Sequence, residues 1–456
     1  MKNKGELPID REFAAKLLEI ALKKGADEAE VYVKTSKSLI VEVREQKVDT
    51  LESSFTAGYC IRVIKDKRLG FSYSADPAEI GDVAGKALSS SEYTEPDDYA
   101  GLPQRPGASP KSVSPGIFDA DIVSLPEDTA IENALLIEKS AFDEDSRIKR
   151  IRKASGSFGI SNTYILNSKG IDSHYSSTGC SASITVIAEQ GSESQMGWEY
   201  EGSRFLRDIS FEQVGRSAAR RAVQLLGARK IPPSKAFILL DNSVTVDFLG
   251  ILASAFSSES VQKKKSMLAG KTGELVVSPR LNVIDSGLLD RRLGSKPVDD
   301  EGIPTTDKVL IKKGVLEGFL YNTYTARKDK VKSTGNAMRG GPAGLPMVGP
   351  TNLYLEPSSG EYTTGIKELV KTMDKGLYVL ETMGMHTANP ISGEFSVGVS
   401  GLWIEGGEIR RPVKEAAVSG NILALFRSAL MIGDDLRFYG NIGAPSVLIE
   451  GIDISG

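Results

Sequence analysis

The chain has 456 residues, of which 40% are hydrophobic and 25% charged, and its formal net charge is −4. One hydrophobic core seldom serves so long a chain, so we expect two domains. The small negative net charge argues against a nucleic-acid partner, because phosphate binding needs clustered Lys and Arg side chains. The first residues lack the apolar core of a signal peptide, and no stretch is apolar enough to span a membrane. We therefore expect a cytoplasmic protein without a membrane partner.

Cysteine and histidine are scarce, which limits the possible chemistry. The chain has two cysteines, Cys60 and Cys180, and two histidines, His174 and His386. We expect both cysteines to be buried free thiols in a reducing compartment. Catalytic zinc sites mostly use two or three histidines, so histidine-based zinc chemistry is disfavoured. We expect neither a bound metal nor another cofactor.

The first part of the chain starts with a helical pattern and then becomes extended. Residues 10–25 repeat apolar side chains at helical spacing, with Asp10 as the cap and Gly25 as the stop. Two β-hairpins are predicted next, because the residues alternate in polarity or are β-branched. Their strands are 30–35 and 39–44, joined by 36–38, and then 59–64 and 69–73, joined by 65–68. A second helix is predicted over 76–91.

A long segment without a regular pattern separates these elements from the next group. Residues 94–118 are rich in Pro, Gly, Ser and Asp and have few apolar anchors, which is typical of a long flexible surface loop or an internal linker. After it we predict helices over 127–143 and 209–227. The strands predicted between these helices are 148–158, 161–167, 171–176 and 181–189.

Two adjacent prolines, Pro232 and Pro233, follow the end of the helix at 209–227 and precede a new strand. This sequence predicts a boundary between an N-terminal α/β domain, residues 1–228, and a β-rich C-terminal domain, residues 234–456. The elements predicted for the C-terminal domain are strands 236–240 and 446–449, hairpins 309–321 and 401–413, and buried helices 243–258 and 421–432. The predicted fold class is α+β, with mostly antiparallel sheets and packed helices.

Several segments, taken together and in order, resemble the TldD/PmbA family, historically also called modulators of DNA gyrase. In the C-terminal half these are residues 299–305, 320–327, 332–337, 350–354, 389–398 and 443–451. Residues 26–31 and 58–63 add to the resemblance in the N-terminal half. The resemblance therefore covers nearly the whole chain.

The TldD-like branch of this family carries His-Glu-x-x-x-His on a buried helix and a Cys near the C-terminus. Two imidazoles and a thiolate can hold zinc, and the Glu can act as a base on zinc-bound water. The matching helix of this chain has Leu249, Gly250 and Ser254 at those positions, and residues 441–445 contain no Cys. The chain therefore resembles the metal-free PmbA (TldE) branch.

The resemblance implies a non-catalytic pseudoenzyme subunit that pairs with a TldD-like zinc peptidase, forms a homodimer, or does both. Such a complex would degrade or process unfolded peptides, which would bind in extended form as an added strand. One alternative is a self-sufficient hydrolase with an unconventional site around His386, Glu394 and Asp300. Another is a homodimeric binding protein without a peptidase partner.

His386 lies in a loop rich in Gly, Asn and Pro, close in sequence to Glu394. It could contact substrate or a partner, or act as an acid or base with Glu394, but we favour a hydrogen bond to the loop backbone. Asp300 belongs to the acidic run 299–302, which could bind Mg²⁺ or Ca²⁺. For this run we favour turn formation, in which Asp accepts backbone N–H groups.

A groove for a peptide or a partner loop is a further hypothesis. The residues assigned to it are Arg327, Asn336, His386, Asn389 and Glu394. A buried Arg needs several acceptors, so Arg327 could equally belong to an internal hydrogen-bond network between strands. Both interpretations of Arg327 remain open from the sequence.

Overall fold

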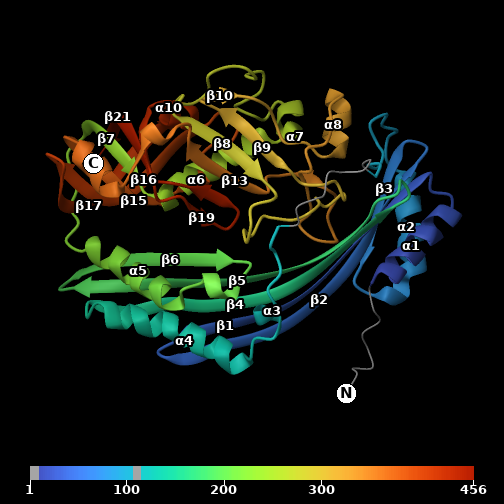
Figure 1. Ribbon diagram of the computed structural model, residues 1–456, viewed down its shortest axis with the longest axis horizontal. Helices are drawn as coiled ribbons and strands as arrows, with labels where there is room; N and C mark the ends of the chain where they lie inside the picture. The colour runs from blue at the N-terminus through green and yellow to red at the C-terminus, as the bar shows by residue number, and fades with distance from the viewer. Residues whose placement is uncertain (1–9, 106–114, 456) are drawn as a thin grey trace.

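The computed structural model describes residues 10–105 and 115–455. We call residues up to 227 the N-terminal half and residues from 234 onward the C-terminal half. The fold is mixed α+β with mostly antiparallel sheets, as predicted. The sheet of the N-terminal half is curved, and the C-terminal half lies on its concave side (Figure 1).

The N-terminal half is built on one antiparallel sheet of six strands in the order β3-β2-β1-β4-β5-β6. The strands are β1 (Glu28–Arg44), β2 (Lys47–Lys65), β3 (Arg68–Ser74), β4 (Ile148–Asn167), β5 (Asp172–Gln190) and β6 (Glu193–Ser203). The helices are α1 (Arg11–Lys23), α2 (Ile80–Ser91), α3 (Ala120–Val123), α4 (Glu127–Glu144) and α5 (Phe211–Gln224).

Two groups of helices pack on this sheet. Helices α1 and α2 pack on β1–β3 at one end, and α4 and α5 pack on β4–β6 at the other. Helices α1, α2 and α4 lie on the side away from the C-terminal half (Figure 1). Helices α4 and α5 approach closely because Gly215 has no side chain: an added Cβ would lie 2.1 Å from the carbonyl oxygen of Ile137. Asp10 caps α1 as predicted, and its side chain accepts a hydrogen bond from the Phe13 N–H at 3.0 Å.

The strands are longer than the sequence predicted. The turn predicted at 36–38 was wrong, because Ser36 pairs with Thr56 of β2 on one side and with Ser161 of β4 on the other. The ladders on both sides satisfy this backbone, so a polar Ser-Lys-Ser sequence does not end the strand. The breaks predicted within β4 and β5 are likewise absent from the structure. The hairpin between β2 and β3 is confirmed, with Asp66 and Lys67 in its turn at φ 49° and 60°.

The segment 94–118 has no helix or strand in its described residues, as predicted, and residues 106–114 lie outside the described part. The apolar anchors of the segment are Leu102, which is fully buried, and Ile117, which is 5% exposed. Arg327 of the C-terminal half donates hydrogen bonds to the carbonyl oxygens of Ala100 at 3.2 Å and Leu102 at 3.0 Å. This part of the segment is therefore fixed between the two halves.

The C-terminal half has two large sheets, a six-stranded one in the order β10-β9-β8-β13-β20-β19 and a seven-stranded one in the order β14-β18-β21-β17-β16-β15-β7. Strand β21 also pairs with β7, which closes a small barrel from β7, β15, β16, β17 and β21. The strands of the first sheet are β8 (Leu281–Ser286), β9 (Asp307–Lys312), β10 (Val315–Leu316), β13 (Asn352–Pro357), β19 (Arg437–Tyr439) and β20 (Ile442–Ala444). Those of the second are β7 (Ser234–Leu240), β14 (Thr363–Thr364), β15 (Lys375–Met383), β16 (Glu394–Glu405), β17 (Glu408–Asn421), β18 (Ala429–Gly433) and β21 (Val447–Ser455).

A short ribbon and several helices complete this half. The ribbon consists of β11 (Ala337–Met338) and β12 (Met347–Val348). The helices are α6 (Asn242–Ala253), α7 (Ser258–Gln262), α8 (Thr323–Asp329), α9 (Ile366–Thr372) and α10 (Ile422–Arg427). No helix in the described ranges is long and apolar enough to cross a membrane.

The two helices predicted for this half have different outcomes. The helix predicted over 243–258 exists as α6, which continues as a 3₁₀ turn over Ser254–Phe256. The helix predicted over 421–432 was wrong in its second part: α10 ends at Arg427, and β18 follows. Strand β18 pairs with β14 and β21, so partners distant in sequence override the local helical pattern.

Candidate functional site

Helix α6 is the helix that the resemblance aligns with the zinc-binding helix. Leu249 is fully buried in the main core of the C-terminal half. Gly250 faces β20, and an added Cβ there would lie 3.6 Å from Cδ1 of Ile442. Ser254 is exposed, and its hydroxyl donates to the carbonyl oxygen of Ile251 at 3.0 Å. The structure therefore brings α6 against the C-terminal segment 441–445, as the resemblance implies.

The residues at these positions do not fit a zinc ion. Zinc in proteins is held by thiolate, imidazole or carboxylate groups. Leu249 has no ligand atom, Gly250 has no side chain, and the Ser254 hydroxyl is engaged with the helix backbone. Across residues 10–105 and 115–455, no group of three or more His, Cys, Asp and Glu side chains is arranged to hold a metal.

Strand β16, which follows the loop that carries His386, packs beside α6. Phe395, at the start of β16, contacts Phe248 of α6 edge to face, with ring centroids 4.9 Å apart. Asn389 shapes the loop, because its Oδ1 accepts hydrogen bonds from the N–H groups of Ile391 at 2.8 Å and Ser392 at 3.2 Å. These hydrogen bonds stabilise the turn at residues 389–392.

His386 is exposed on the loop, and Glu394 is exposed at the first position of β16. Oε1 of Glu394 accepts a hydrogen bond from Nδ2 of Asn421 at 3.1 Å. The hydrogen bond that we favoured from His386 to the loop backbone is not formed with any residue that the structure describes. The imidazole instead faces outward from a 3₁₀ turn, Met385–Thr387.

Asp300 lies in a different environment from His386 and Glu394. It is 6% exposed and forms an ion pair with Lys296 at 3.1 Å. Its Oδ2 accepts the backbone N–H of Arg339 at 2.7 Å. No hydrogen bond or ion pair within the described ranges joins Asp300 to His386 or Glu394. The three residues of the hydrolase alternative therefore share no hydrogen bond or ion pair in the described part of the chain.

The acidic run 299–302 forms a turn, which is the interpretation favoured from sequence. Oδ1 of Asp299 accepts the N–H groups of Glu301 and Ile303, both at 2.9 Å, and Oδ2 accepts that of Ala337 at 3.0 Å. Burial and the neighbouring Glu301 carboxylate raise the pKa of Asp299 to about 7. Burial also opposes ionisation of Glu301, but Arg62 and the hydrogen bonds from Thr323 bring its pKa below the ordinary value.

This turn docks on the N-terminal sheet through buried charges. Nη2 of Arg62, on β2, contacts Oε2 of Glu30 at 2.8 Å and Oε1 of Glu301 at 2.9 Å. Arg339 pairs with the other oxygen of Glu30. All four side chains are at most 8% exposed. We call Glu30, Arg62, Glu301 and Arg339 the arginine–glutamate cluster; it joins the two halves at one end of the sheet.

Arg327 and Asn336, two of the predicted groove residues, take part in hydrogen bonds inside the protein. Arg327 is half-buried and binds the two carbonyl groups of the 94–105 segment described above. Asn336 is 1% exposed, and its Nδ2 donates to Oδ2 of Asp285 at 2.8 Å and to the carbonyl oxygen of Gly349 at 3.0 Å. These contacts correspond to the network alternative for Arg327. Within the described ranges, neither residue forms a hydrogen bond with His386, Asn389 or Glu394.

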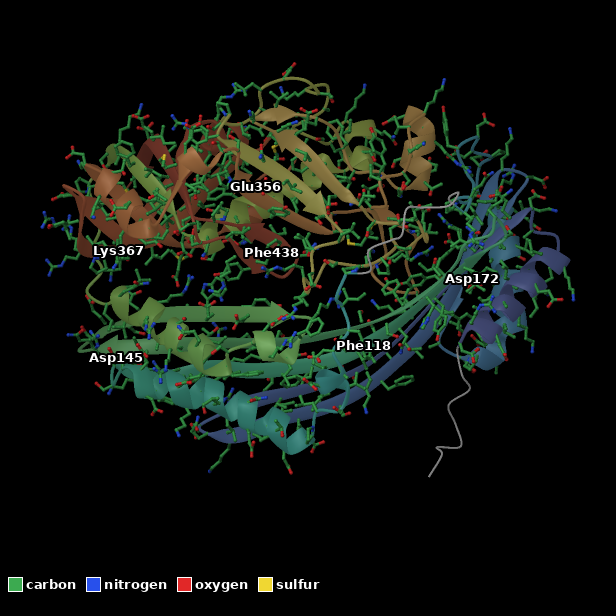
Figure 2. The ribbon with its side chains drawn as sticks, in the orientation of Figure 1. Phe118, Asp145, Asp172, Glu356, Lys367 and Phe438 are labelled. Atoms are coloured by element: carbon green, nitrogen blue, oxygen red, sulfur yellow. The ribbon has the colours of Figure 1, made fainter. Side chains whose placement is uncertain are left out.

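A second junction joins the halves at the other end of the sheet. Nη2 of Arg221, on α5, contacts Oδ1 of Asp241 at 3.2 Å, and Asp241 caps α6. The hydroxyl of Tyr378 donates to the other Asp241 oxygen at 3.1 Å. Glu199 of β6 pairs with Arg437 of β19 at 2.8 Å. The residue that follows, Phe438, lies on the face of the C-terminal half turned toward the sheet (Figure 2).

Glu381 of β15 makes the stability of the fold depend on pH. Burial raises its pKa from 4.5 to about 7, although the charge of Arg221 opposes the shift. Below about pH 4.5 the carboxyl is protonated in both the folded and the unfolded chain. As the pH rises to about 7, the unfolded chain loses this proton first, so Glu381 increasingly destabilises the fold.

We therefore expect Glu381 to lower the stability of the wild type as the pH rises from about 4.5 to about 7. The variant Glu381→Gln should lack this effect. The difference in free energy of unfolding between variant and wild type should grow across this range by on the order of 3 kcal/mol. Denaturant titrations of both proteins at several pH values measure it. A difference that stays constant with pH would contradict the assignment.

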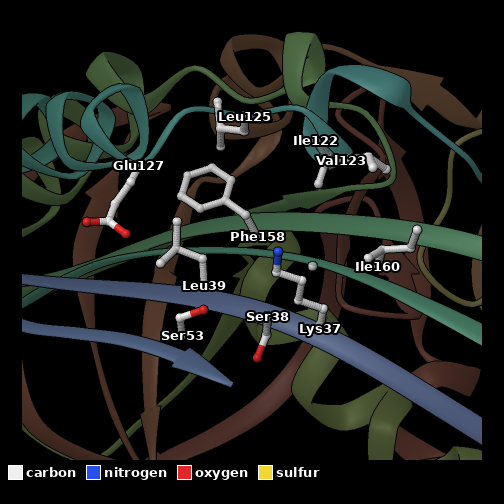
Figure 3. Close-up of a pocket in the computed structure, with 11 residues that line it drawn as sticks. Lys37, Ser38, Leu39, Ser53, Ile122, Val123, Leu125, Glu127, Phe158 and Ile160 are labelled. Carbon is white, nitrogen blue, oxygen red and sulfur yellow. The ribbon is translucent and has the colours of Figure 1, made fainter. Parts of the chain in front are cut away.

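The sequence did not predict the pocket drawn in Figure 3. It has a volume of about 170 Å³ and lies between β1, β4 and the segment that enters α4. Phe158 and Leu39 form its apolar wall, and Lys37 and Glu127 supply charged groups. These residues come from segments far apart in sequence, so no local pattern indicates the pocket.

Both cysteines are buried and free, as predicted. Burial raises the pKa of Cys60 to about 11 and that of Cys180 to about 12. Because the thiolate is the reactive form, neither residue is suited to act as a nucleophile near neutral pH.

Known proteins resemble this chain along most of its length. Models of PmbA/TldA metallopeptidase domains match residues 29–91 (domain 1), 120–226 (central domain) and 233–456 (C-terminal domain). The Metalloprotease PmbA homolog of Buchnera aphidicola subsp. Acyrthosiphon pisum is 33% identical over 433 residues, which are 94% of this chain and 93% of that protein.

Two solved structures have the same fold. A protein of Thermotoga maritima MSB8 described as a modulator of a DNA gyrase has a TM-score of 0.88 and 30% identity, covering 97% of this chain and 99% of that chain. TldE from Thermococcus kodakarensis has a TM-score of 0.86 and 22% identity, covering 97% of this chain and 100% of that chain. Together with the matched domains and the 33% identical relative, these similarities show that the chain belongs to the PmbA/TldD metallopeptidase family.

Proposed function

We propose that this chain is a non-catalytic, metal-free subunit of the PmbA/TldE kind. It pairs with a TldD-like zinc metallopeptidase and helps to degrade or process unfolded peptides in the cytoplasm. The observation that carries the proposal is α6, where Leu249, Gly250 and Ser254 stand at the ligand and base positions. The helix is retained and packed, while the groups that zinc chemistry needs are replaced.

Two further observations support a scaffold role. Asp300, Arg327 and Asn336, which could have supplied acid, base or binding groups, form hydrogen bonds inside the protein. His386 and Glu394 are exposed, so a partner or an extended peptide could reach them. In this proposal peptides bind as an added strand, and the partner supplies the zinc-bound water.

Replacement of His386 separates this proposal from the self-sufficient hydrolase. With His386→Ala, we expect weaker partner binding or no effect, and no loss of a peptidase activity intrinsic to this chain. His174→Ala is the matched control, because His174 stacks on Tyr164 of the N-terminal sheet with ring centroids 4.2 Å apart. If the purified chain hydrolyses unstructured peptides alone and His386→Ala abolishes this activity, the hydrolase interpretation is correct and the proposal fails.

A further inference from the structure

A cavity of about 380 Å³ lies where the two halves meet, beside the arginine–glutamate cluster. Its N-terminal wall comes from β2, the start of β3 and residues 94–101, and its C-terminal wall from α7, α8 and residues 345–347. Its volume is at the small end of the range found for ligand sites in proteins. It therefore suits a ligand of about the size of an amino acid or dipeptide.

Most of the accessible surface inside this cavity is apolar. The apolar side chains are Ile64, Leu69, Leu345, Pro346 and Met347. Three of them are also large hydrophobic groups left partly in water: Leu345 is 37% exposed and Met347 53%, and Leu69 is half-buried. Covering such side chains with an apolar ligand group is favourable by about 25 cal/mol for each Å² removed from water.

Arg62 provides a hydrogen-bond donor in the wall of the cavity. It is 7% exposed, and its Nη2 is engaged by Glu30 and Glu301. Its Nε is enclosed and has no partner among the residues described. Nη1 is therefore the part of the guanidinium left for a ligand, and it requires a carbonyl or carboxylate oxygen as acceptor. The charge of Arg62 is already balanced by two carboxylates, so the acceptor need not be charged.

The remaining charged groups of the cavity are acidic. Glu95 is exposed, and Asp97 is half-buried and held in place by the hydroxyl of Tyr324 at 2.7 Å and the N–H of Tyr99 at 2.8 Å. Glu259 also lines the cavity but is paired with Lys263 at 2.5 Å. Lys328, whose Nζ lies 4.7 Å from the centre of the Tyr324 ring, partly balances the charge of Asp97. Glu95 forms no ion pair with a described residue, so it supplies most of the negative charge near the apolar wall, which favours a ligand with a positive group.

We propose that this cavity binds an α-amino group that carries an apolar side chain, either as a free amino acid or as the amino terminus of a peptide. The ammonium group lies against Glu95 and Asp97, and the side chain covers Leu69 and Leu345. The adjacent carbonyl or carboxylate oxygen accepts a hydrogen bond from Arg62. The site would recognise a substrate or product of peptide cleavage, so its biological meaning rests on the proposed role in peptide processing.

Calorimetry with small probes tests the proposal on the chain alone. We expect leucinamide to bind, and both N-acetyl-leucinamide and glycinamide to bind at least about ten-fold more weakly, because each lacks one of the two recognised groups. Free leucine and Leu-Gly-Gly distinguish the two sources: tighter binding of leucine assigns an amino-acid site, and tighter binding of the tripeptide assigns a site for peptide amino termini. Equal binding of leucinamide and its acetylated form would overturn the proposal, as would no binding of leucine, leucinamide and Leu-Gly-Gly at millimolar concentration.

Surface variants locate the binding without disturbing the buried cluster. Glu95→Gln should weaken leucinamide binding by about three- to ten-fold, and Leu345→Trp should abolish it by filling the cavity. Glu92→Gln is the matched control, because Glu92 is exposed nearby but does not line the cavity. If none of these variants changes binding, leucinamide binds elsewhere and the assignment of this cavity is wrong. No zinc partner is present in these measurements, so their failure is distinguishable from a failure to pair with a peptidase.

Discussion

Glu30→Ala should lower the free energy of unfolding by about 3–5 kcal/mol. The substitution leaves two buried cations, Arg62 and Arg339, without the carboxylate that they share. Removing one member of a buried ion network is costly because the remaining charges are neither solvated nor paired. Since Arg339 belongs to the C-terminal half and Glu30 to the N-terminal sheet, we also expect the two halves to unfold less cooperatively.

Tryptophan fluorescence during urea denaturation measures this effect in both halves. The chain has two tryptophans, Trp198 in the N-terminal sheet and Trp403 in the barrel, so single-tryptophan variants report on each half separately. Glu19→Ala is the control, because Glu19 pairs with Lys23 on the exposed side of α1. Such pairs contribute little, so its unfolding midpoint should not move. Equal midpoints for Glu30→Ala and Glu19→Ala would show that the cluster does not stabilise the junction.

Leu249→Ala should lower the free energy of unfolding by about 2–5 kcal/mol, because it opens a cavity inside a packed core. Leu249 occupies a ligand position of the zinc branch, but in this chain it is a fully buried core residue. The peptidase activity of a complex with the zinc partner, normalised to folded protein, should not change. Thermal denaturation and a peptide-cleavage assay measure the two quantities.

Leu136→Ala on α4 provides the comparison for Leu249→Ala. Leu136 also lies on a helix but is 39% exposed, so its replacement should change stability by about 0.5 kcal/mol or less. A Leu249→Ala variant with unchanged stability and altered peptide cleavage would mean that this position acts in catalysis, contrary to the structural interpretation.

Local sequence signals predicted the elements whose ends are set by nearby residues. Asp10 caps α1, and the charged turn at 65–68 closes the β2–β3 hairpin, because caps and tight turns depend on a few neighbouring residues. Ser36 was assigned to a turn and residues 429–432 to a helix. Both assignments failed because pairing with strands distant in sequence determines the structure there.

The sequence assigned the candidate site from the family resemblance and not from a local pattern. That resemblance placed α6 beside the C-terminal segment, and Gly250 does face Ile442. The sequence did not predict the arginine–glutamate cluster. A signal was present, because Arg62 interrupts the apolar run Cys-Ile-Arg-Val-Ile and Glu30 interrupts the apolar run Ala-Glu-Val. A charged residue within a buried strand needs a buried partner, but the sequence does not show which residue that partner is.

Metal analysis after separate and joint purification is the most direct test of whether this chain is a metal-free subunit of a zinc peptidase. A TldD-like protein carrying His-Glu-x-x-x-His is purified alone and with this chain, and zinc is quantified in each subunit after the complex is separated. We expect zinc in the partner only, and chelator-sensitive peptide cleavage only where the partner is present. Stoichiometric zinc in this chain, with chelator-sensitive cleavage of unstructured peptides by the chain alone, would contradict this expectation.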